Sequence, residues 1–498
     1  MALPPPAGTT STPQGCRPLG RWCPNGLALL LLASPLGLGC SAAARLGGVP
    51  SAAPPLPAGF QVVFNHRVGP RYRSPVTGQW RSGDDLEAFL LDNVRQARRS
   101  ILVAVQELSL PRLAEALVEQ KRRGLRVQVV LENNYSSPWS EQHPADLEPH
   151  QRQRQAQLRA LGWGDAVALL RDGGVPMLDD TADGSAGSGL MHHKFMVIDG
   201  QVVVTGSANF TASGIHGDAG APQSRGNVNH LLRIASPELA SLFTAEFRRL
   251  WGDGPGGAAD SRFGIAKDSG GLQTVQVGGT GVSVLFAPHR RSDPRHGLQL
   301  LETLLLDTRQ RADLALFVFS DQRLAAALGQ LQARGVAIRV LADPGFATRS
   351  FSEVLDLLGV ALPDHRCGIE ANNAPLKQPL EGVGTPRLAA GDKMHHKVAV
   401  LDQRTVITGS FNWSPSAAHQ NDETLLVIHS PLLARHFTDE VDRLWKGAEL
   451  GITARLQRKR ERQRLRCGSG LQRPPTPAHL RSDPTSHGAD GLTIGRQG

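Results

Sequence analysis

Two stretches of the chain carry the same reactive side chains at the same spacing. The first reads MHHKFMVIDGQVVVTGSANF at 191–210, and the second reads MHHKVAVLDQRTVITGSFNW at 394–413. A His, a Lys, an Asp, a Gly-Ser pair and an Asn occupy matching places in both. The separation between the two copies is the same at the histidines as at the serines, so the repeat indicates an internal duplication of residues that can do chemistry.

The apolar stretch after each lysine predicts a buried strand, and a second apolar stretch after a turn predicts its neighbour. Side chains alternate along a strand, so His192 and Lys194 are expected on one side. His193 and, by the same argument, His396 are expected on the other side, as packing residues.

Two such motifs facing each other suit the cleavage of a phosphodiester. A neutral imidazole can attack phosphorus to form a phosphohistidine, and a second, protonated imidazole can protonate the leaving oxygen. Lysine and asparagine donors can stabilise the charge on the remaining phosphate oxygens. The pattern therefore predicts an enzyme site that needs no metal and no other cofactor.

The doubled motif resembles that of the phospholipase D superfamily, and the likeness extends over residues 60–446. The resemblance implies that His192 is the nucleophile and His395 the general acid. Ser207 and Ser410 either line the phosphate pocket or cap the helix that follows. The resemblance further implies four phosphate ligands, Lys194, Lys397, Asn209 and Asn412, and two structural motif residues, Asp199 and Asp402.

The family also carries an acidic residue beyond the motif that hydrogen-bonds a catalytic histidine. The string NDETLLVI supplies Glu423 in the second half, whereas NVNHLLRI puts Asn229 at the matching place in the first half. We therefore expect Glu423 beside His395, where a carboxylate raises the imidazole pKa and favours the acid form. An amide beside His192 would leave that ring neutral and nucleophilic; the alternative is that the amide marks a weakened first site.

Each half also repeats a strand, a helix and a second strand, at 100–134 and 312–345. Strands that alternate with helices predict an α/β fold with a mostly parallel sheet flanked by helices. We expect two similar phospholipase D-like lobes related by a pseudo-twofold axis, with the active site between them, in a chain that works as a monomer. The expected divisions are an export signal at 1–40, a linker at 41–58, the first lobe at 59–251, a linker at 252–281, the second lobe at 282–447, and a basic tail at 448–498 that is disordered beyond a short helix.

The N-terminal segment has the layout of an export signal. Arg17 and Arg21 precede an apolar run at 27–38, which ends in small residues. LGLGC resembles a bacterial lipoprotein cleavage site with Cys40 as the lipidated residue, so we expect the cell envelope or the exterior. The alternatives are an uncleaved hydrophobic tail or a start codon placed too early.

Cysteine usage and charge add two expectations. Five cysteines without metal-ligand spacing make a disulfide framework improbable. The net charge is +9, but much of it lies at 455–466, so the remainder of the chain is only mildly basic.

Three classes of function fit these observations. The first is hydrolysis of phospholipid headgroup esters at a membrane surface. The second is an endonuclease that cleaves DNA or RNA with the same site, for which a groove of cations and aromatics beside the histidines would be expected. The third, a binding module with a dead site, is disfavoured because His and Lys are intact in both copies.

Overall fold

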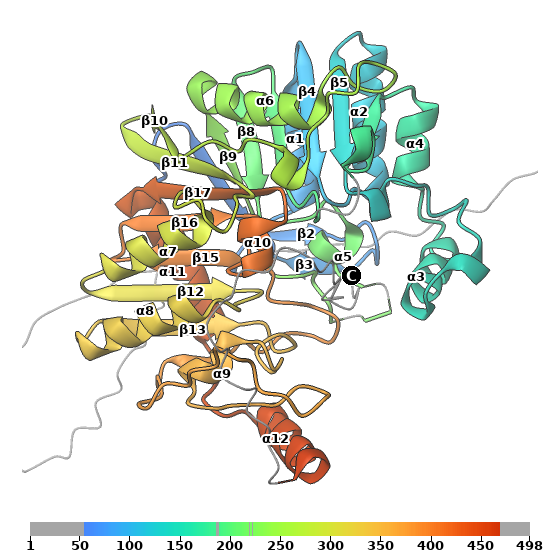
Figure 1. Ribbon diagram of the computed structural model, residues 1–498. Helices are drawn as coiled ribbons and strands as arrows, with labels where there is room; N and C mark the ends of the chain where they lie inside the picture. The colour runs from blue at the N-terminus through green and yellow to red at the C-terminus, as the bar shows by residue number, and fades with distance from the viewer. Residues whose placement is uncertain (1–53, 186–188, 219, 222, 469–498) are drawn as a thin grey trace, which may run out of the picture. The chain divides into compact units, whose positions relative to one another are not determined.

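The computed structural model describes residues 54–185, 189–218, 220–221 and 223–468, whose elements are shown in Figure 1. The predicted export signal at 1–40, with Cys40, lies outside the described residues. Within those residues, no helix has both the length and the apolar character that crossing a bilayer requires.

The first lobe is built on a seven-stranded sheet in the order β1-β9-β8-β7-β4-β5-β6. Its strands are β1 (Phe60–Phe64), β4 (Ser100–Val105), β5 (Arg126–Leu131), β6 (Met177–Asp179), β7 (Lys194–Ile198), β8 (Val202–Gly206) and β9 (His230–Ala235), and β2 (Arg71–Arg73) pairs separately with β3 (Trp80–Ser82). The helices are α1 (Leu86–Gln96), α2 (Pro111–Arg122), α3 (Pro149–Ala160), α4 (Ala166–Asp172), α5 (Ala212–Ile215) and α6 (Pro237–Trp251), with short 3₁₀ turns at Asn133–Tyr135, Pro144–Asp146, Ala182–Gly184 and Gly264–Ala266.

The second lobe repeats this plan on a nine-stranded sheet in the order β10-β11-β17-β16-β15-β12-β13-β14-β18. Its strands are β10 (Gln273–Val277), β11 (Thr280–Ala287), β12 (Arg311–Leu316), β13 (Ala337–Ala342), β14 (Val383–Thr385), β15 (Lys397–Leu401), β16 (Thr405–Gly409), β17 (Glu423–His429) and β18 (Glu449–Leu450). The helices are α7 (Gly297–Leu306), α8 (Gln322–Ala333), α9 (Glu353–Leu357), α10 (Pro415–His419), α11 (Pro431–Trp445) and α12 (Ala454–Cys467).

The α/β class and the two similar lobes are confirmed, but the sheets are mixed and not mostly parallel. Among the strands of the described residues, only β4-β5, β5-β6, β12-β13 and β13-β14 pair in parallel, and the other pairs are antiparallel. The physical reason is the length of the connections. Each motif is a strand, a short turn and a second strand, and such a turn can join only antiparallel neighbours. The strand–helix–strand units supply the parallel part.

The helices inside those units form where their sequence patterns predict them. In α2, Leu113 and Leu117 lie one turn apart and are fully buried, and the helix ends before Gly124, whose φ of 91° is left-handed. In α8, Leu324 and Leu328 are likewise fully buried one turn apart, and the helix ends before Gly335, whose φ of 76° is also left-handed. The helices α7 and α8 pack side by side in the second lobe (Figure 1).

A shared hydrophobic core joins the two lobes. One continuous buried cluster contains side chains from β1, β7 and α6 of the first lobe and from β11, β15 and α11 of the second. The rings of Phe243 and Phe286 meet edge to face at 5.2 Å, as do those of Phe64 and Phe437. The duplicated halves therefore fold against each other as a single compact unit.

Two sequence-predicted boundaries differ from the structure. Part of the expected linker at 252–281 belongs to the second lobe, because β10 pairs with β11 and adds an edge strand to its sheet. The expected tail also begins with a strand, because β18 pairs with β14. Helix α12 is the short basic helix that the sequence predicts, and a disulfide between Cys367 and Cys467 ties it to the lobe. The sequence analysis, which found a disulfide framework improbable, did not predict this single bond, because cysteines 100 residues apart in sequence meet only in the folded chain.

Candidate active site

The two motifs meet where the lobes exchange backbone hydrogen bonds. The strands β7 and β15 begin at the motif lysines, so both histidines stand just before a strand. The His192 amide donates to the Asp422 carbonyl at 3.0 Å, and the His395 amide donates to the Val228 carbonyl at 3.2 Å. Each motif histidine is thus held by a segment of the opposite lobe, the one before β17 for His192 and the one before β9 for His395.

This exchange reverses the predicted pairing of Glu423. Its Oε2 lies 2.8 Å from Nδ1 of His192, not beside His395. Both residues are buried, with the Glu423 side chain fully inaccessible to solvent. The pairing was predicted wrongly because Glu423 was assigned to the histidine of its own half, whereas the start of β17 faces the motif of the other lobe.

His395 has an amide partner in place of a carboxylate. Its Nδ1 lies 3.0 Å from the Asn229 side-chain oxygen and 3.0 Å from the Ser207 carbonyl oxygen. Both of these atoms accept hydrogen bonds, so Nδ1 carries the proton of the neutral ring and leaves Nε2 with its lone pair. The same reasoning applies to His192, because the carboxylate of Glu423 also accepts.

Burial is the main influence on the protonation of this cluster. Burial, followed by the charges of Lys194 and Lys397, holds the pKa values of His192 and His395 well below the usual histidine range. Burial also raises the pKa of Glu423 to about 7, against the opposing effect of Lys194. The ground state therefore has two neutral imidazoles and a carboxyl group that titrates near neutral pH.

The two motif lysines are fully buried and anchored in parallel ways. Nζ of Lys194 donates to the His192 carbonyl at 2.8 Å, and Nζ of Lys397 donates to the His395 carbonyl at 2.8 Å. Burial lowers the pKa of Lys194 to about 7 and that of Lys397 well below its usual range. An anionic phosphate between them would favour their charged forms, because an opposite charge offsets the cost of burial.

The motif asparagines bring unsatisfied polar atoms to the same place. The Oδ1 atoms of Asn209 and Asn412 are buried and lack a hydrogen-bond partner among the described residues. Nδ2 of Asn209 has two N–H groups, one of which donates to Gln106 Oε1, so the other can donate to a phosphate oxygen. Rotating the Asn412 amide by 180° presents its NH₂ group in place of the oxygen, so it can donate as well.

The motif serines hold the partners of the histidines. Ser207 Oγ donates to Asn229 Oδ1 at 2.8 Å, and Ser410 Oγ donates to Glu423 Oε2 at 2.6 Å. The caps of the following helices are other residues, Thr211 for α5 and Ser414 for α10. The helix-capping alternative for the serines is therefore wrong, and the phosphate-pocket alternative stays a prediction. In this structure the two serines position Asn229 beside His395 and Glu423 beside His192.

Asp199 and Asp402 lie in the turns between the motif strands, both with left-handed φ. The Asp199 carboxylate accepts from the backbone amides of residues 98–100, and Asp402 accepts in the same way from residues 309–311. These carboxylates fix the turn to the start of the neighbouring strand and contact neither histidine.

His193 and His396 face away from the paired histidines into the core. His193 contacts Thr424 Oγ1 at 2.8 Å and Glu246 Oε1 at 3.1 Å, and His396 contacts Glu440 Oε1 at 3.1 Å. Their position follows from the alternation of side chains along the motif strands.

Two residues near the site were not predicted from the sequence. Gln106 Oε1 accepts from Nζ of Lys194 at 3.4 Å and from Nδ2 of Asn209 at 3.2 Å. At the matching place in the second lobe, the Phe317 ring lies 4.7 Å from the His395 ring and 4.8 Å below Nζ of Lys397. Their shared position directly after β4 and β12 is the sequence signal that could have identified them.

The longer connection in the first lobe also reaches this region. Arg154 of α3 forms an ion pair with the buried Glu107, which directly follows Gln106. The insertion that makes the first half longer is therefore fixed beside the site by a charge pair.

A metal-ligand cluster is not found among the described residues, where no group of three or more His, Cys, Asp or Glu side chains is placed to hold an ion. The positive charge next to the histidines comes from Lys194 and Lys397.

Comparison with known proteins agrees with the doubled motif. Residues 90–251 and 301–445, more than half of the chain, match the family described as "Cardiolipin synthase, PLD-like domain". The mitochondrial cardiolipin hydrolase of Danio rerio is 30% identical over 178 residues, which cover 34% of this chain and 69% of that protein. The human mitochondrial cardiolipin hydrolase is 32% identical over 154 residues, which cover 30% of this chain and 53% of that protein.

Among solved structures, the phosphatidylserine synthase of Haemophilus influenzae Rd KW20 aligns with a TM-score of 0.45 and 13% identity, over 78% of this chain and 89% of that one. The alignments to the two cardiolipin hydrolases span from about half to about two thirds of those proteins. Because the family match covers more than half of the chain and both motif copies are complete, the chain belongs to the phospholipase D superfamily and is a hydrolase of the phosphodiesterase type.

Proposed function

We propose that the protein hydrolyses phospholipid headgroup esters without a metal, through a covalent phosphohistidine on His192. The observation that carries this proposal is the buried pair between His192 Nδ1 and Glu423 at 2.8 Å. The carboxylate fixes the proton on Nδ1, so the lone pair of Nε2 is free to attack phosphorus. It also stabilises the positive charge that the ring acquires as the bond to phosphorus forms.

His395 completes the first step as the general acid. When a phosphodiester binds, its negative charge raises the pKa of the nearby imidazole, and Nε2 takes up a proton. As the bond between phosphorus and the leaving oxygen breaks, His395 transfers this proton to that oxygen. The headgroup then leaves as an alcohol, and the phosphatidyl group stays on His192.

Water completes the second step. Neutral His395 accepts a proton from a water molecule as its oxygen attacks phosphorus, and the bond from phosphorus to Nε2 of His192 breaks. Lys194, Lys397, Asn209 and Asn412 are the proposed donors to the phosphate oxygens in both steps.

The choice of lipid and location rests on two observations. The curated relatives are named for cardiolipin hydrolysis, which makes cardiolipin the first lipid to test. The disulfide between Cys367 and Cys467 fits an oxidising compartment, which supports the proposal that the protein is exported to the cell envelope or beyond. We also propose that Cys40 is lipidated, which would anchor the exported protein to a membrane.

The deciding experiment offers cardiolipin, phosphatidylcholine, and single- and double-stranded nucleic acid to the purified protein in the presence of EDTA. We expect lipid turnover by the wild type, at least 1,000-fold less by His192→Ala, and a ³²P-labelled acid-labile adduct that depends on His192. Nucleic-acid cleavage without lipid turnover would establish the endonuclease alternative. Loss of activity on adding EDTA would contradict the metal-free mechanism.

A further inference from the structure

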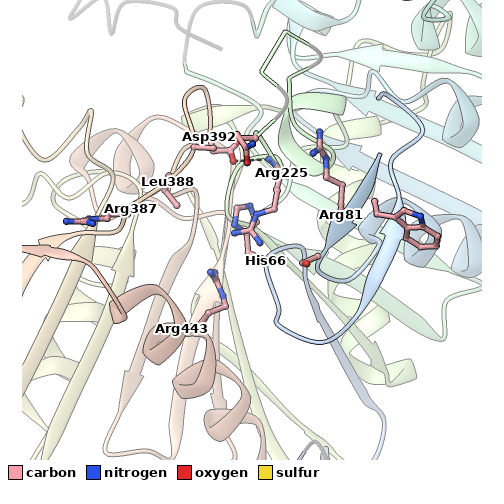
Figure 2. A pocket seen from close by; sticks show the side chains of 11 residues that line it. His66, Arg81, Arg225, Arg387, Leu388, Asp392 and Arg443 are labelled. Atoms are coloured by element: carbon pink, nitrogen blue, oxygen red, sulfur yellow. Dashed lines mark hydrogen bonds between the residues drawn. The ribbon is translucent and has the colours of Figure 1, made fainter. Parts of the chain in front are cut away.

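A second polar pocket, of about 520 Å³, lies apart from the paired histidines, none of which lines it. Its wall comes from both lobes: the β3 hairpin, the segment before β9, the segment before the second motif, and α11. The lining residues that matter here are Arg81, Arg225, Arg387, Arg443, His66 and Asp392. Figure 2 shows Arg225 and Arg443 near His66, whereas Arg387 lies farther from it.

Cations outnumber anions in this pocket. Among the described lining residues there are four arginines and one carboxylate, that of Asp392, while Glu440 and Glu449 outside the lining pair with Arg443 and Arg387. Asp392 already accepts from the backbone amides of Arg225 at 3.0 Å and Gly226 at 3.2 Å, and from the Ser224 hydroxyl. Burial and then repulsion by Arg443 lower the pKa of Arg225. An anion in the pocket would relieve this crowding of like charges.

His66 adds an unsatisfied buried atom to the pocket wall. The residue is 2% exposed, and its Nε2 donates to the Gly226 carbonyl at 2.8 Å. Its Nδ1 has no hydrogen-bond partner among the described residues. Burial, with help from Arg443 and Arg225, lowers the pKa of His66 to about 3, so the ring is neutral and Nδ1 can accept from a hydroxyl group of a ligand.

The duplicated fold shows how the equivalent place is filled in the other half. There Lys267, from the segment between the lobes, lies buried between Glu246 and Asp422 and donates to the Ala287 carbonyl at 3.0 Å. Glu246 of α6 corresponds to Glu440 of α11, which pairs with Arg443. In each half a cation of the chain thus pairs with the carboxylate of the closing helix, Lys267 with Glu246 and Arg443 with Glu440, and the second of these cations lines the pocket.

We propose that this arginine pocket binds the phosphate of a phosphomonoester, separately from the catalytic site, with the hydroxyl of a glycerol-phosphate-like group at His66. The bidentate geometry of arginine suits phosphate oxygens. Trp80, also in the lining, is 68% exposed, and an exposed indole at such a site is typical of a surface that meets lipid headgroups. The same chemistry could come from a membrane lipid or from a soluble glycerol phosphate.

The test measures binding in the His192→Ala background, so that it stands whether or not the protein hydrolyses lipids. Glycerol 3-phosphate is titrated by calorimetry, and vesicles of phosphatidylcholine with or without phosphatidic acid are tested by sedimentation. Each is repeated with Arg225→Gln and with Arg387→Gln, whose side chain is 75% exposed. The matched control is Arg122→Gln, which removes the same charge from the exposed end of α2.

We expect each pocket substitution to weaken binding at least tenfold, while Arg122→Gln changes it less than twofold. If the pocket substitutions weaken the binding of glycerol 3-phosphate only, the pocket takes a soluble ligand. If they weaken only the binding to vesicles with phosphatidic acid, the pocket takes a lipid. The proposal would be overturned if both pocket variants bound the two ligands as tightly as the control does and unfolded at the same temperature as the background protein.

Discussion

At the scale of single residues, the two halves of the site differ in the partner of each histidine. His192 has the carboxylate of Glu423, whereas His395 has the amide of Asn229, and each partner is held by a motif serine. A carboxylate is the better partner for a ring that becomes cationic while bonded to phosphorus, and an amide leaves the acid easier to deprotonate. The assignment of nucleophile and acid stays a prediction, and its physical reason is now the opposite of the one expected from the sequence.

Glu423→Gln tests this reason. The glutamine can still accept from Nδ1 of His192, but it cannot stabilise the developing charge, so kcat should fall on the order of 100- to 10,000-fold. Steady-state kinetics on the preferred lipid measure the fall, and Glu238→Gln, an exposed change in α6, serves as the control. A loss below threefold would exclude this role for the carboxylate.

The same variant should change the pH profile. The pKa of Glu423 is raised to about 7, so the ionised, active form is lost as the pH falls through 7. We expect kcat/KM of the wild type to decline below pH 7 and this limb to disappear in Glu423→Gln. A limb that persists in the variant belongs to another group.

At the scale of secondary-structure elements, the C-terminal helix depends on a covalent link. Helix α12 is largely exposed, with Leu456 as its only buried residue, and its last residue, Cys467, is bonded to Cys367. Few apolar contacts therefore hold this helix, and the disulfide limits its freedom to detach.

Cys367→Ser combined with Cys467→Ser should lower the free energy of unfolding by about 2–4 kcal/mol and expose α12 to trypsin, which has many arginines to cut there. Thermal unfolding and limited proteolysis measure the two effects, and the wild type treated with reductant should behave as the variant does. Unchanged proteolysis of the variant would show that packing alone holds the helix.

At the scale of the whole molecule, buried charges from both lobes meet at Lys267. Its ammonium group lies between Glu246 of α6 and Asp422, which precedes β17, and all three side chains are almost fully buried. Although burial raises the pKa of Glu246, the charge of Lys267 and the hydrogen bond to His193 lower it to about 2. Removing the cation would leave two carboxylates without compensation in a low-dielectric interior.

Lys267→Met should therefore cost about 3–5 kcal/mol of unfolding free energy, because methionine keeps the volume and removes the charge. Urea unfolding at pH 7 measures the loss. Asp422→Asn and Glu246→Gln added to Lys267→Met should recover part of it, and no recovery would mean that packing, not charge, is responsible.

The sequence by itself determined the duplication, the α/β class, the helices within each repeat, and the residues gathered at the site. These follow from local patterns: alternation along strands puts His192 and Lys194 on one side and His193 on the other, and identical spacing gives both copies the same geometry. The tertiary structure decided which side chains from distant segments meet. It placed Glu423 beside His192, brought Cys367 to Cys467, and paired β10 with the second sheet, because each of these contacts depends on how one lobe or strand packs against another and leaves no trace in local spacing.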